Sequence, residues 1–363
     1  MNIEPVELGP RKGRGAVTNK VGRFERHDRI LTDDGWEVHD PRRGDPPPKL
    51  RTTLGIDTAK TVIARNKSPD IPFDQSINPY RGCEHGCVYC FARPTHAYYG
   101  LSSGLDFETR LFHKPDAAKV LRRELSNPKY VPKPIALGTN TDPYQPIEKA
   151  EETTRQVLQV LAEFNHPFTI VTKGALITRD LDIIGPMAEK GMAAVWLSVT
   201  TLDRKLANVM EPRASTPSKR LEAVSTLAAA GVPTGILMAP IIPAINDWEI
   251  ERVLEASKDA GANRAGYVLL RLPHEIKDLF TEWLEAHFPD RAARVLSLVK
   301  QTRGGRLYDS TWGKRQRGEG PVADLIAKRF GVGVRKLRLD GPRPDLDLTQ
   351  FTVPGRAEQL SLL

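Results

Sequence analysis

Short apolar runs alternate with amphipathic helical stretches through the middle of the chain, and this alternation limits the possible folds more than any other feature. Five runs have the length and composition of buried strands, at residues 134–138, 168–172, 194–198, 234–238 and 265–270. Residues 76–80 form a weaker first member of the series. The stretches between the runs carry apolar residues three or four apart, at residues 153–164, 180–190, 218–230 and 249–260. Gly191, Gly231 and Gly261 follow three of them, as is common after a helix.

Six strands alternating with helices predict parallel βαβ units, because right-handed crossovers bury continuous apolar strands beneath a helical layer. Six units are too few for the closed eight-stranded barrel. The sequence therefore predicts an α/β fold, a partial (β/α)6 open barrel. Functional residues are then expected at the C-terminal ends of the strands and in the loops that follow them.

The flanks of this alternating region differ from it in composition. Residues 1–65 are rich in Gly, Pro and charge and predict an irregular N-terminal extension, followed by the barrel core at residues 66–299. After the barrel strands we expect helices near residues 275–287, 290–301 and 320–330. Residues 300–343 form a basic C-terminal helical segment, and residues 344–363 an extended tail.

Composition excludes several classes of protein. The chain has 363 residues, a net charge of +8 and 40% hydrophobic residues, which is too apolar and too evenly charged for a disordered chain. No window approaches the ~18 consecutive apolar residues of a membrane span, and the first residues lack the apolar run of a secretory signal. We therefore expect a cytoplasmic protein without membrane partners.

The basic excess is concentrated in residues 300–343, which hold twelve basic and four acidic residues. Tyr308, Trp312 and Phe330 are interleaved with the basic side chains. Such a segment can neutralise phosphates and stack bases, so it predicts nucleic-acid binding. The alternative is a solvated helical face.

The chain has three cysteines, Cys83, Cys87 and Cys90, in the order CxxxCxxC on the loop after the first predicted strand. An odd, tightly bunched set is not a disulfide framework and indicates a metal site in a reducing compartment. Three thiolates on one curling loop can bind three corners of an iron–sulfur cube, and Gly82 and Gly86 allow the tight backbone turns. The iron left open could chelate a small molecule carrying both an amine and a carboxylate.

The alternative is a Cys3His zinc site completed by His85 or His96, although structural zinc sites usually take their ligands as two separated pairs.

At these residues the sequence resembles the radical S-adenosylmethionine superfamily, whose signature is CxxxCx-aromatic-C, with Tyr89 at the aromatic position. The resemblance covers about residues 74–275. It implies a [4Fe-4S] cluster that passes an electron to S-adenosyl-L-methionine, giving methionine and a 5′-deoxyadenosyl radical that abstracts hydrogen from a substrate. It also implies an electron donor such as flavodoxin or ferredoxin.

The later motifs resemble the spore-photoproduct-lyase-like branch, often labelled DNA repair photolyases. Residues 168–173 and 196–201 resemble the strand ends that give that branch a Lys and a Ser contacting S-adenosylmethionine, here Lys173 and Ser198. The loop carrying Asn140, Thr141 and Asp142 occupies the place where the superfamily binds the methionyl amine.

The resemblance has departures that bear on the reaction. In the lyase a Cys donates hydrogen to the product radical, and Asn140 stands at that position. Phe91 replaces the tyrosine that follows the last cluster cysteine. Both parts of that hydrogen relay are missing, which argues against spore photoproduct repair. Tyr98, Tyr99 or Tyr144 could supply another donor, and each is equally suited to packing.

Three further motifs resemble parts of this branch or of its partners. Arg213, in a recurrent Glu-Pro-Arg, could bind the cofactor carboxylate or a substrate phosphate, or form a structural ion pair. Residues 11–17 and 308–318 resemble a bacterial subfamily of the branch and say nothing about substrate. The last five residues, Gln359-Leu360-Ser361-Leu362-Leu363, resemble the peptide with which bacterial repair proteins bind the sliding clamp. The alternative is a Leu-rich end that packs on the protein's own core.

Two other classes of function stay open from the sequence. One is an iron–sulfur or zinc protein that binds nucleic acid without turnover, and the other is an adaptor recruited to the clamp through its tail.

Overall fold

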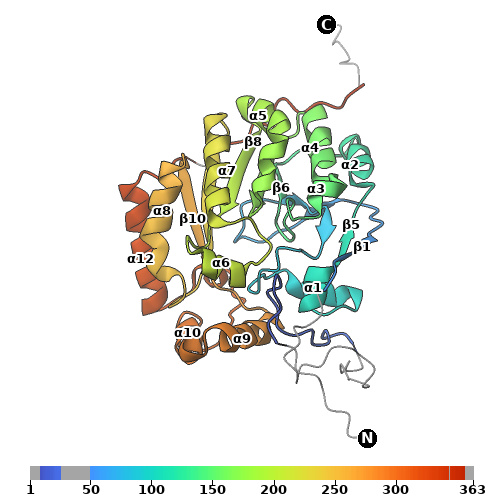
Figure 1. Ribbon diagram of the computed structural model, residues 1–363. Coiled ribbons are helices and arrows are strands. Elements are labelled where there is room, and N and C mark those ends of the chain that lie inside the picture. Colours follow the sequence, from blue (N-terminus) through green and yellow to red (C-terminus); the bar gives the residue numbers. More distant parts are fainter. Residues whose placement is uncertain (1–8, 26–49, 343, 356–363) are drawn as a thin grey trace, which may run out of the picture.

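A computed structural model describes residues 9–25, 50–342 and 344–355 of the chain (Figure 1). Its centre is a sheet in the order β10-β9-β8-β7-β6-β3-β2. The strands are β2 (Ile63–Arg65), β3 (Gln75–Ile77), β6 (Ile135–Leu137), β7 (Phe168–Thr172), β8 (Ala193–Ser198), β9 (Thr234–Ile241) and β10 (Arg264–Leu269). All neighbours are parallel except β2, which pairs antiparallel with β3.

The six parallel strands from β3 to β10 follow one another in chain order, as they do in a barrel. Within the described residues β10 and β3 are not paired with each other, so the sheet stays open. The predicted partial (β/α)6 barrel is confirmed, including its weak first strand.

The helices between the strands cover one face of the sheet, except α6, which lies below the ends of the strands (Figure 1). They are α2 (Ala117–Leu125), α3 (Glu148–Glu151), α4 (Thr153–Glu163), α5 (Leu181–Glu189), α6 (Arg204–Met210), α7 (Pro217–Ala229) and α8 (Ile250–Asp259). The spacing of their buried residues explains why they form: α4 buries Val157, Leu158 and Leu161 on one side. Helix α7 begins with Pro217 in its first turn and is followed by Gly231 at a φ of 75°.

A second sheet of three short strands lies beside the barrel. It contains β1 (Thr53–Ile56), β5 (Arg110–His113) and β4 (Tyr80–Arg81), with β5 in the centre. Strands β1 and β2 fall inside the segment expected to be irregular. They were missed because three or four half-exposed residues show no clear period, and β1 pairs with a strand more than fifty positions away.

The remaining helices lie at the C-terminal ends of the strands or flank the barrel. They are α1 (Leu105–Thr109), the 3-10 helices η2 (Arg93–Tyr99), η3 (Ala175–Asp180) and η4 (Asp247–Glu249), then α9 (Ile276–His287), α10 (Pro289–Gln301), α11 (Lys314–Arg317) and α12 (Pro321–Lys336). Helix α12 packs on α8 and on β10, where Phe330 of α12 meets Tyr267 of β10 with ring centres 4.7 Å apart. No helix among the described residues has the length and hydrophobicity needed to cross a membrane.

Candidate cluster and cofactor site

The three cysteines lie on a loop that follows β4 at the C-terminal end of the barrel strands. Cys83 and Cys87 are buried and Cys90 is half-buried. The loop turns sharply at Gly82 and Gly86, whose φ values of 72° and 68° are left-handed. A Cβ atom at Gly82 would lie 2.6 Å from the Leu111 side chain, so only glycine fits there.

The thiols suit a cationic iron cluster chemically. Burial raises the pKa of all three, that of Cys87 to about 12. At neutral pH they stay protonated until a bound metal supplies positive charge and displaces the protons. The three-thiol donor set therefore fits a [4Fe-4S] cluster, which Cys83, Cys87 and Cys90 would hold.

The two histidines considered as zinc ligands have other partners. His85 Nδ1 lies 3.3 Å from Asp142 Oδ2. His96 is buried, its Nε2 lies 2.9 Å from the Arg110 carbonyl oxygen, and its ring packs edge-on against Phe107. Among the described residues no group of three or more His, Cys, Asp or Glu side chains, the three cysteines included, is arranged to hold a single metal ion such as zinc.

The loop after β6 is shaped by Asn78. The Asn78 Oδ1 atom accepts hydrogen bonds from the backbone N–H groups of Asn140 and Thr141, at 2.9 and 3.3 Å. The buried Thr141 hydroxyl donates to the Tyr80 carbonyl oxygen at 3.0 Å. Thr141 is thus turned into the protein, whereas the half-buried Asn140 carboxamide has no hydrogen bond to another described residue.

Asp142 ties three segments together. Its carboxylate accepts from the Thr172 hydroxyl at 2.6 Å and from the Lys173 backbone N–H at 2.8 Å, and it faces His85. Burial opposes ionisation, but His85 and these donors lower the pKa of Asp142 to about 2. The carboxylate is therefore ionised at neutral pH and joins the ends of β6 and β7 to the cluster loop.

Lys173 and Ser198 stand where predicted, directly after β7 and at the last position of β8. The Lys173 ammonium lies 5.7 Å from the centre of the Tyr89 ring. Ser198 is buried, and its carbonyl oxygen accepts a hydrogen bond from Arg220 at 3.0 Å. Asn140 and Lys173 thus follow the C-terminal ends of β6 and β7, and Ser198 ends the neighbouring parallel strand β8.

A buried carboxylate beside the cluster loop was missed from the sequence. Glu211 accepts a hydrogen bond from the Tyr89 hydroxyl at 2.8 Å and from the Thr200 hydroxyl, and it pairs with Arg220 at 3.1 Å. Burial alone would raise the pKa of Glu211. The positive charges of Arg220 and Lys173 have a larger effect in the opposite direction, so the pKa is lowered overall. Glu211 belongs to the Glu-Pro-Arg motif, in which only Arg213 had been considered.

Arg213 itself makes a structural contact. Its guanidinium lies 3.3 Å from the carboxylate of Glu84, which is buried inside the cluster loop, and its backbone N–H donates to the His85 carbonyl oxygen. The structure shows Arg213 in an ion pair, and 40% of its side chain is exposed, so its predicted contact with the cofactor carboxylate or a substrate phosphate stays a prediction.

A second missed pair lies under the cluster loop. The fully buried Arg93 donates to the carbonyl oxygens of Gly86 at 3.0 Å and Cys87 at 2.8 Å, and it pairs with the buried Glu108. In the sequence this pair is marked only by Arg93, three positions after Cys90. Its partner Glu108 lies 15 residues further along, and no periodic pattern links the two.

The candidate hydrogen donors contact other aromatic rings or a carboxylate. Tyr98 is 72% exposed, and its ring is tilted against that of Phe24, with ring centres 5.2 Å apart. Tyr99 stacks on Phe112 at 5.4 Å. The buried Tyr144 donates its hydroxyl hydrogen to Asp180 at 3.0 Å.

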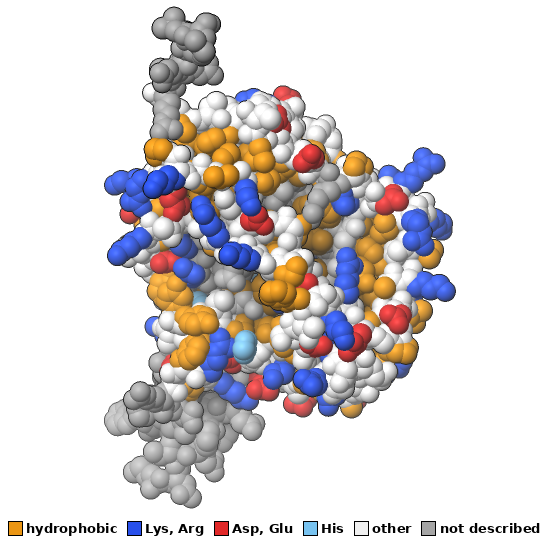
Figure 2. Space-filling model, turned by 180° about the vertical axis from the view of Figure 1, so that it is seen from behind, with side chains coloured by type: hydrophobic (Ala, Val, Ile, Leu, Met, Phe, Trp, Pro, Cys, Tyr) orange, Lys and Arg blue, Asp and Glu red, His pale blue; other side chains and the backbone are white. Residues whose placement is uncertain are grey.

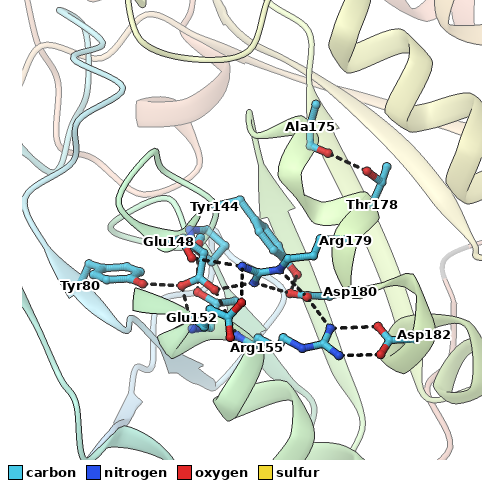
Figure 3. A network of polar contacts seen from close by, with 12 residues as sticks. Tyr80, Tyr144, Glu148, Glu152, Arg155, Ala175, Thr178, Arg179, Asp180 and Asp182 are labelled. Atoms are coloured by element: carbon cyan, nitrogen blue, oxygen red, sulfur yellow. Dashed lines mark hydrogen bonds and ion pairs between the residues drawn. The ribbon is translucent and has the colours of Figure 1, made fainter. Parts of the chain in front are cut away.

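Tyr144 belongs to a polar network that joins Tyr80 to α3, η3 and α4 (Figure 3). Tyr80, at the start of the cluster loop, hydrogen-bonds Glu148, which pairs with Arg179 at 2.7 Å. Arg179 and Arg155 both pair with Asp180 at 2.8 Å. Buried charges in this network have opposite partners, so its role is to fix β4 and the loop after β6.

Beside the cluster loop, Arg271 follows the end of β10. Its guanidinium lies 5.1 Å from the centre of the Phe91 ring, and Phe91 is 46% exposed next to Cys90. The buried Nε atoms of Arg271 and Arg303 have no hydrogen-bond partner among the described residues. Burial and the charge of Arg271 lower the pKa of Arg303 to about 10. This corner therefore holds two positive charges close together.

The basic segment as a whole is partly neutralised. Lys314 pairs with Glu319, Arg315 with Asp70 and Arg329 with Glu251. On the face shown in Figure 2, Lys and Arg side chains lie along both flanks with Asp and Glu among them. The predicted clamp-binding peptide, residues 359–363, lies outside the described residues.

Comparison with known proteins identifies the family. Residues 77–256 match the family model of the Radical SAM superfamily. "Uncharacterized protein Rv2578c" of Mycobacterium tuberculosis is 36% identical over 270 residues, which cover 73% of this chain and 78% of that protein. "Uncharacterized protein MJ0683" of Methanocaldococcus jannaschii is 28% identical over 191 residues, or 53% and 68% of the two chains. The chain belongs to the radical SAM superfamily.

Solved structures of spore photoproduct lyase share the fold. A mutant of that enzyme superposes with a TM-score of 0.55 at 16% identity, covering 79% of each chain. Another structure of it, with bound AdoMet and dinucleoside spore photoproduct, gives a TM-score of 0.54 at 16% identity and covers 78% of each chain. The protein is thus a radical SAM enzyme with a fold like that of spore photoproduct lyase.

Proposed function

We propose that Cys83, Cys87 and Cys90 hold a [4Fe-4S] cluster and that S-adenosyl-L-methionine binds beside it. The observation that carries this proposal is the buried loop that gathers all three thiols of the chain at the C-terminal mouth of an open barrel. When bound, these groups supply a 5′-deoxyadenosyl radical that abstracts hydrogen from a substrate.

The protein's own part is to bind and orient the cofactor. Asn140 offers a free carboxamide to an ammonium group, and Lys173 offers an ammonium to a carboxylate. Ser198 follows on the next strand, and Tyr89 packs between Lys173 and Glu211. Thr141 and Asp142 act by shaping the loop, because their polar atoms are engaged within the protein.

Anaerobic reconstitution tests the cluster and the cleavage together. We expect about four irons per chain and release of 5′-deoxyadenosine when the reduced protein meets S-adenosylmethionine, with flavodoxin or ferredoxin as the physiological reductant. The Cys87→Ala variant should lose both, and an exposed-site control, Lys119→Ala on α2, should keep both. Retained cleavage in Cys87→Ala would refute the proposal. A colourless protein with one zinc would favour the binding protein without turnover.

The reaction we propose is not spore photoproduct repair. Asn140 replaces the cysteine of that relay and carries no readily donated hydrogen atom, and Phe91 carries no hydroxyl. If a tyrosine quenches the product radical, Tyr98 and Tyr99 are the candidates nearest the cluster loop in sequence. Replacing each by Phe should then leave deoxyadenosine formation intact while changing the product.

We propose a nucleic acid as substrate, held at the corner formed by Arg271 and Phe91. The Arg271 guanidinium can bind a phosphate through its other N–H groups, and the half-exposed Phe91 ring beside the cluster suits a base. Deuterated candidate nucleic acids identify the substrate directly, because the abstracted deuterium appears in 5′-deoxyadenosine by mass spectrometry. If no nucleic acid transfers deuterium, this substrate class is excluded.

A further inference from the structure

The N-terminal segment at residues 11–20, here called the strap, lies against the back of the cluster loop. Its closest approach is at Gly15, where a Cβ atom would lie 1.8 Å from the Gly86 carbonyl oxygen. Gly86 is the residue before Cys87, so the strap touches the loop between two cysteines. Only a residue without a side chain allows this contact, which explains Gly15 in the motif of residues 11–17.

Glu108 connects the strap to the loop. Its carboxylate accepts hydrogen bonds from the backbone N–H groups of Gly15 at 3.0 Å and Ala16 at 2.8 Å. The same carboxylate pairs with Arg93. Arg14 adds a hydrogen bond from its guanidinium to the Glu108 carbonyl oxygen at 2.9 Å. Glu108 and Arg93 are fully buried, so neither side chain can exchange these partners for water.

Arg93 passes this constraint to the cysteines. Its guanidinium binds the carbonyl oxygens of Gly86 and Cys87 on one side and those of Ser103 and Gly104 on the other. The peptide groups around Cys87 are therefore held from behind by a planar, five-donor side chain.

The far end of the strap is anchored as well. The Thr18 hydroxyl donates to Glu282 on α9 at 2.7 Å, and Lys20 pairs with the same carboxylate at 2.5 Å. Asn19 exchanges two hydrogen bonds with Asp106 on α1. The strap is thus fixed to two helices and to the loop, and it holds the loop through Glu108 and Arg93.

We propose that the strap positions the cluster loop, with Gly15, Glu108 and Arg93 as positioning residues that keep the three thiols arranged for cluster binding. The inference rests on the proposed function, because the role of the strap is to serve cluster binding. The contacts themselves are made between residues of the chain and need no bound cluster. Residues that orient metal ligands in this way commonly change metal affinity by about 10- to 100-fold when they are replaced.

The test compares Gly15→Ala with Gly9→Ala, since a Cβ atom at Gly9 meets nothing within 4 Å. Hydrogen exchange is measured on the full chain before and after reconstitution. We expect Gly15→Ala to speed exchange of the amides at residues 83–90 at least tenfold without changing β8 or α7, and to lower iron affinity about 10- to 100-fold. Gly9→Ala should match the wild type.

The proposal is overturned if Gly15→Ala speeds hydrogen exchange in the strap while exchange at residues 83–90 stays unchanged. If that variant does not fold, Arg14→Ala decides, because it removes the hydrogen bond from the strap to the Glu108 carbonyl oxygen and leaves the Glu108–Arg93 pair in place. Faster exchange at residues 83–90 then supports the proposal, and unchanged exchange refutes it. Exchange before reconstitution needs neither cluster nor cofactor. Failure of cleavage in the wild type would therefore refute the proposed function while leaving this inference standing.

Discussion

At the N-terminal end of the barrel, opposite the cluster loop, His166 joins three parts of the chain. Its Nε2 lies 2.8 Å from the Tyr130 hydroxyl, and its ring meets Phe351 of the C-terminal tail edge-on at 5.5 Å. Tyr130 in turn donates to Gln75 of β3 at 2.8 Å. Burial lowers the pKa of His166 to about 4, because the groups around it offer no carboxylate to a charged ring.

We therefore predict a histidine-specific loss of stability in mild acid. The unfolded chain binds a proton near pH 6.5 and the folded chain only near pH 4. The stability from neutral His166 is complete above pH 6.5 and is lost as the pH falls toward 4. From pH 7 to pH 4.5 the wild type should lose about 2.5 kcal/mol more unfolding free energy than His166→Gln, measured by urea unfolding. Parallel losses in the two proteins would contradict this.

At the scale of elements, Glu211 and Arg220 join the cluster loop to the helical layer. Glu211 follows α6 and Arg220 lies on α7, and both side chains are fully buried. Glu211 also receives the Tyr89 hydroxyl from the cluster loop. Removing one charge of such a pair leaves the other buried and unpaired, which costs far more than an exposed pair is worth.

The matched prediction uses two glutamates of the same region. Glu211→Gln should lower the free energy of unfolding by about 3–5 kcal/mol, because Arg220 stays charged and buried. Glu222→Gln breaks the exposed Lys219–Glu222 pair on α7, with 62% and 63% exposed side chains, and should cost less than about 1 kcal/mol. Urea unfolding measures both, and equal effects would show that the buried pair contributes no more than the exposed one.

The elements that could be predicted from sequence are those with a repeating apolar pattern. The runs that became β6 to β10 and the stretches that became α4, α5, α7 and α8 are buried along periodic faces. The cysteine spacing likewise lies within one loop. The buried ion pairs Arg93–Glu108 and Arg220–Glu211 could not be predicted from the sequence. The fold alone brings their partners together, and no local pattern marks such pairs.

At the scale of the whole molecule, the basic segment at residues 300–343 runs from one end of the barrel to the other. Arg303 donates to the Leu270 carbonyl oxygen, just past the end of β10, so the first part of the basic segment lies at the mouth. The backbone of Asp340 forms an isolated antiparallel β-bridge with Arg264 at the start of β10, so the last part of the basic segment lies at the opposite end. Helix α12 spans the distance between them. The mouth and the far end can therefore be tested separately.

If the substrate is a nucleic acid bound at the mouth, charges there must matter more than equal charges at the far end. The paired variant Arg271→Gln with Arg306→Gln removes two mouth charges, and Arg335→Gln with Lys336→Gln removes two exposed charges near the far end. The mouth pair should weaken binding and reduce the slope of log affinity against log salt by about 1 for each phosphate that is no longer neutralised. The far-end pair should leave the slope unchanged. Titration of labelled single-stranded DNA at several salt concentrations measures both, and equal effects of the two pairs would mean that binding follows net charge rather than the mouth.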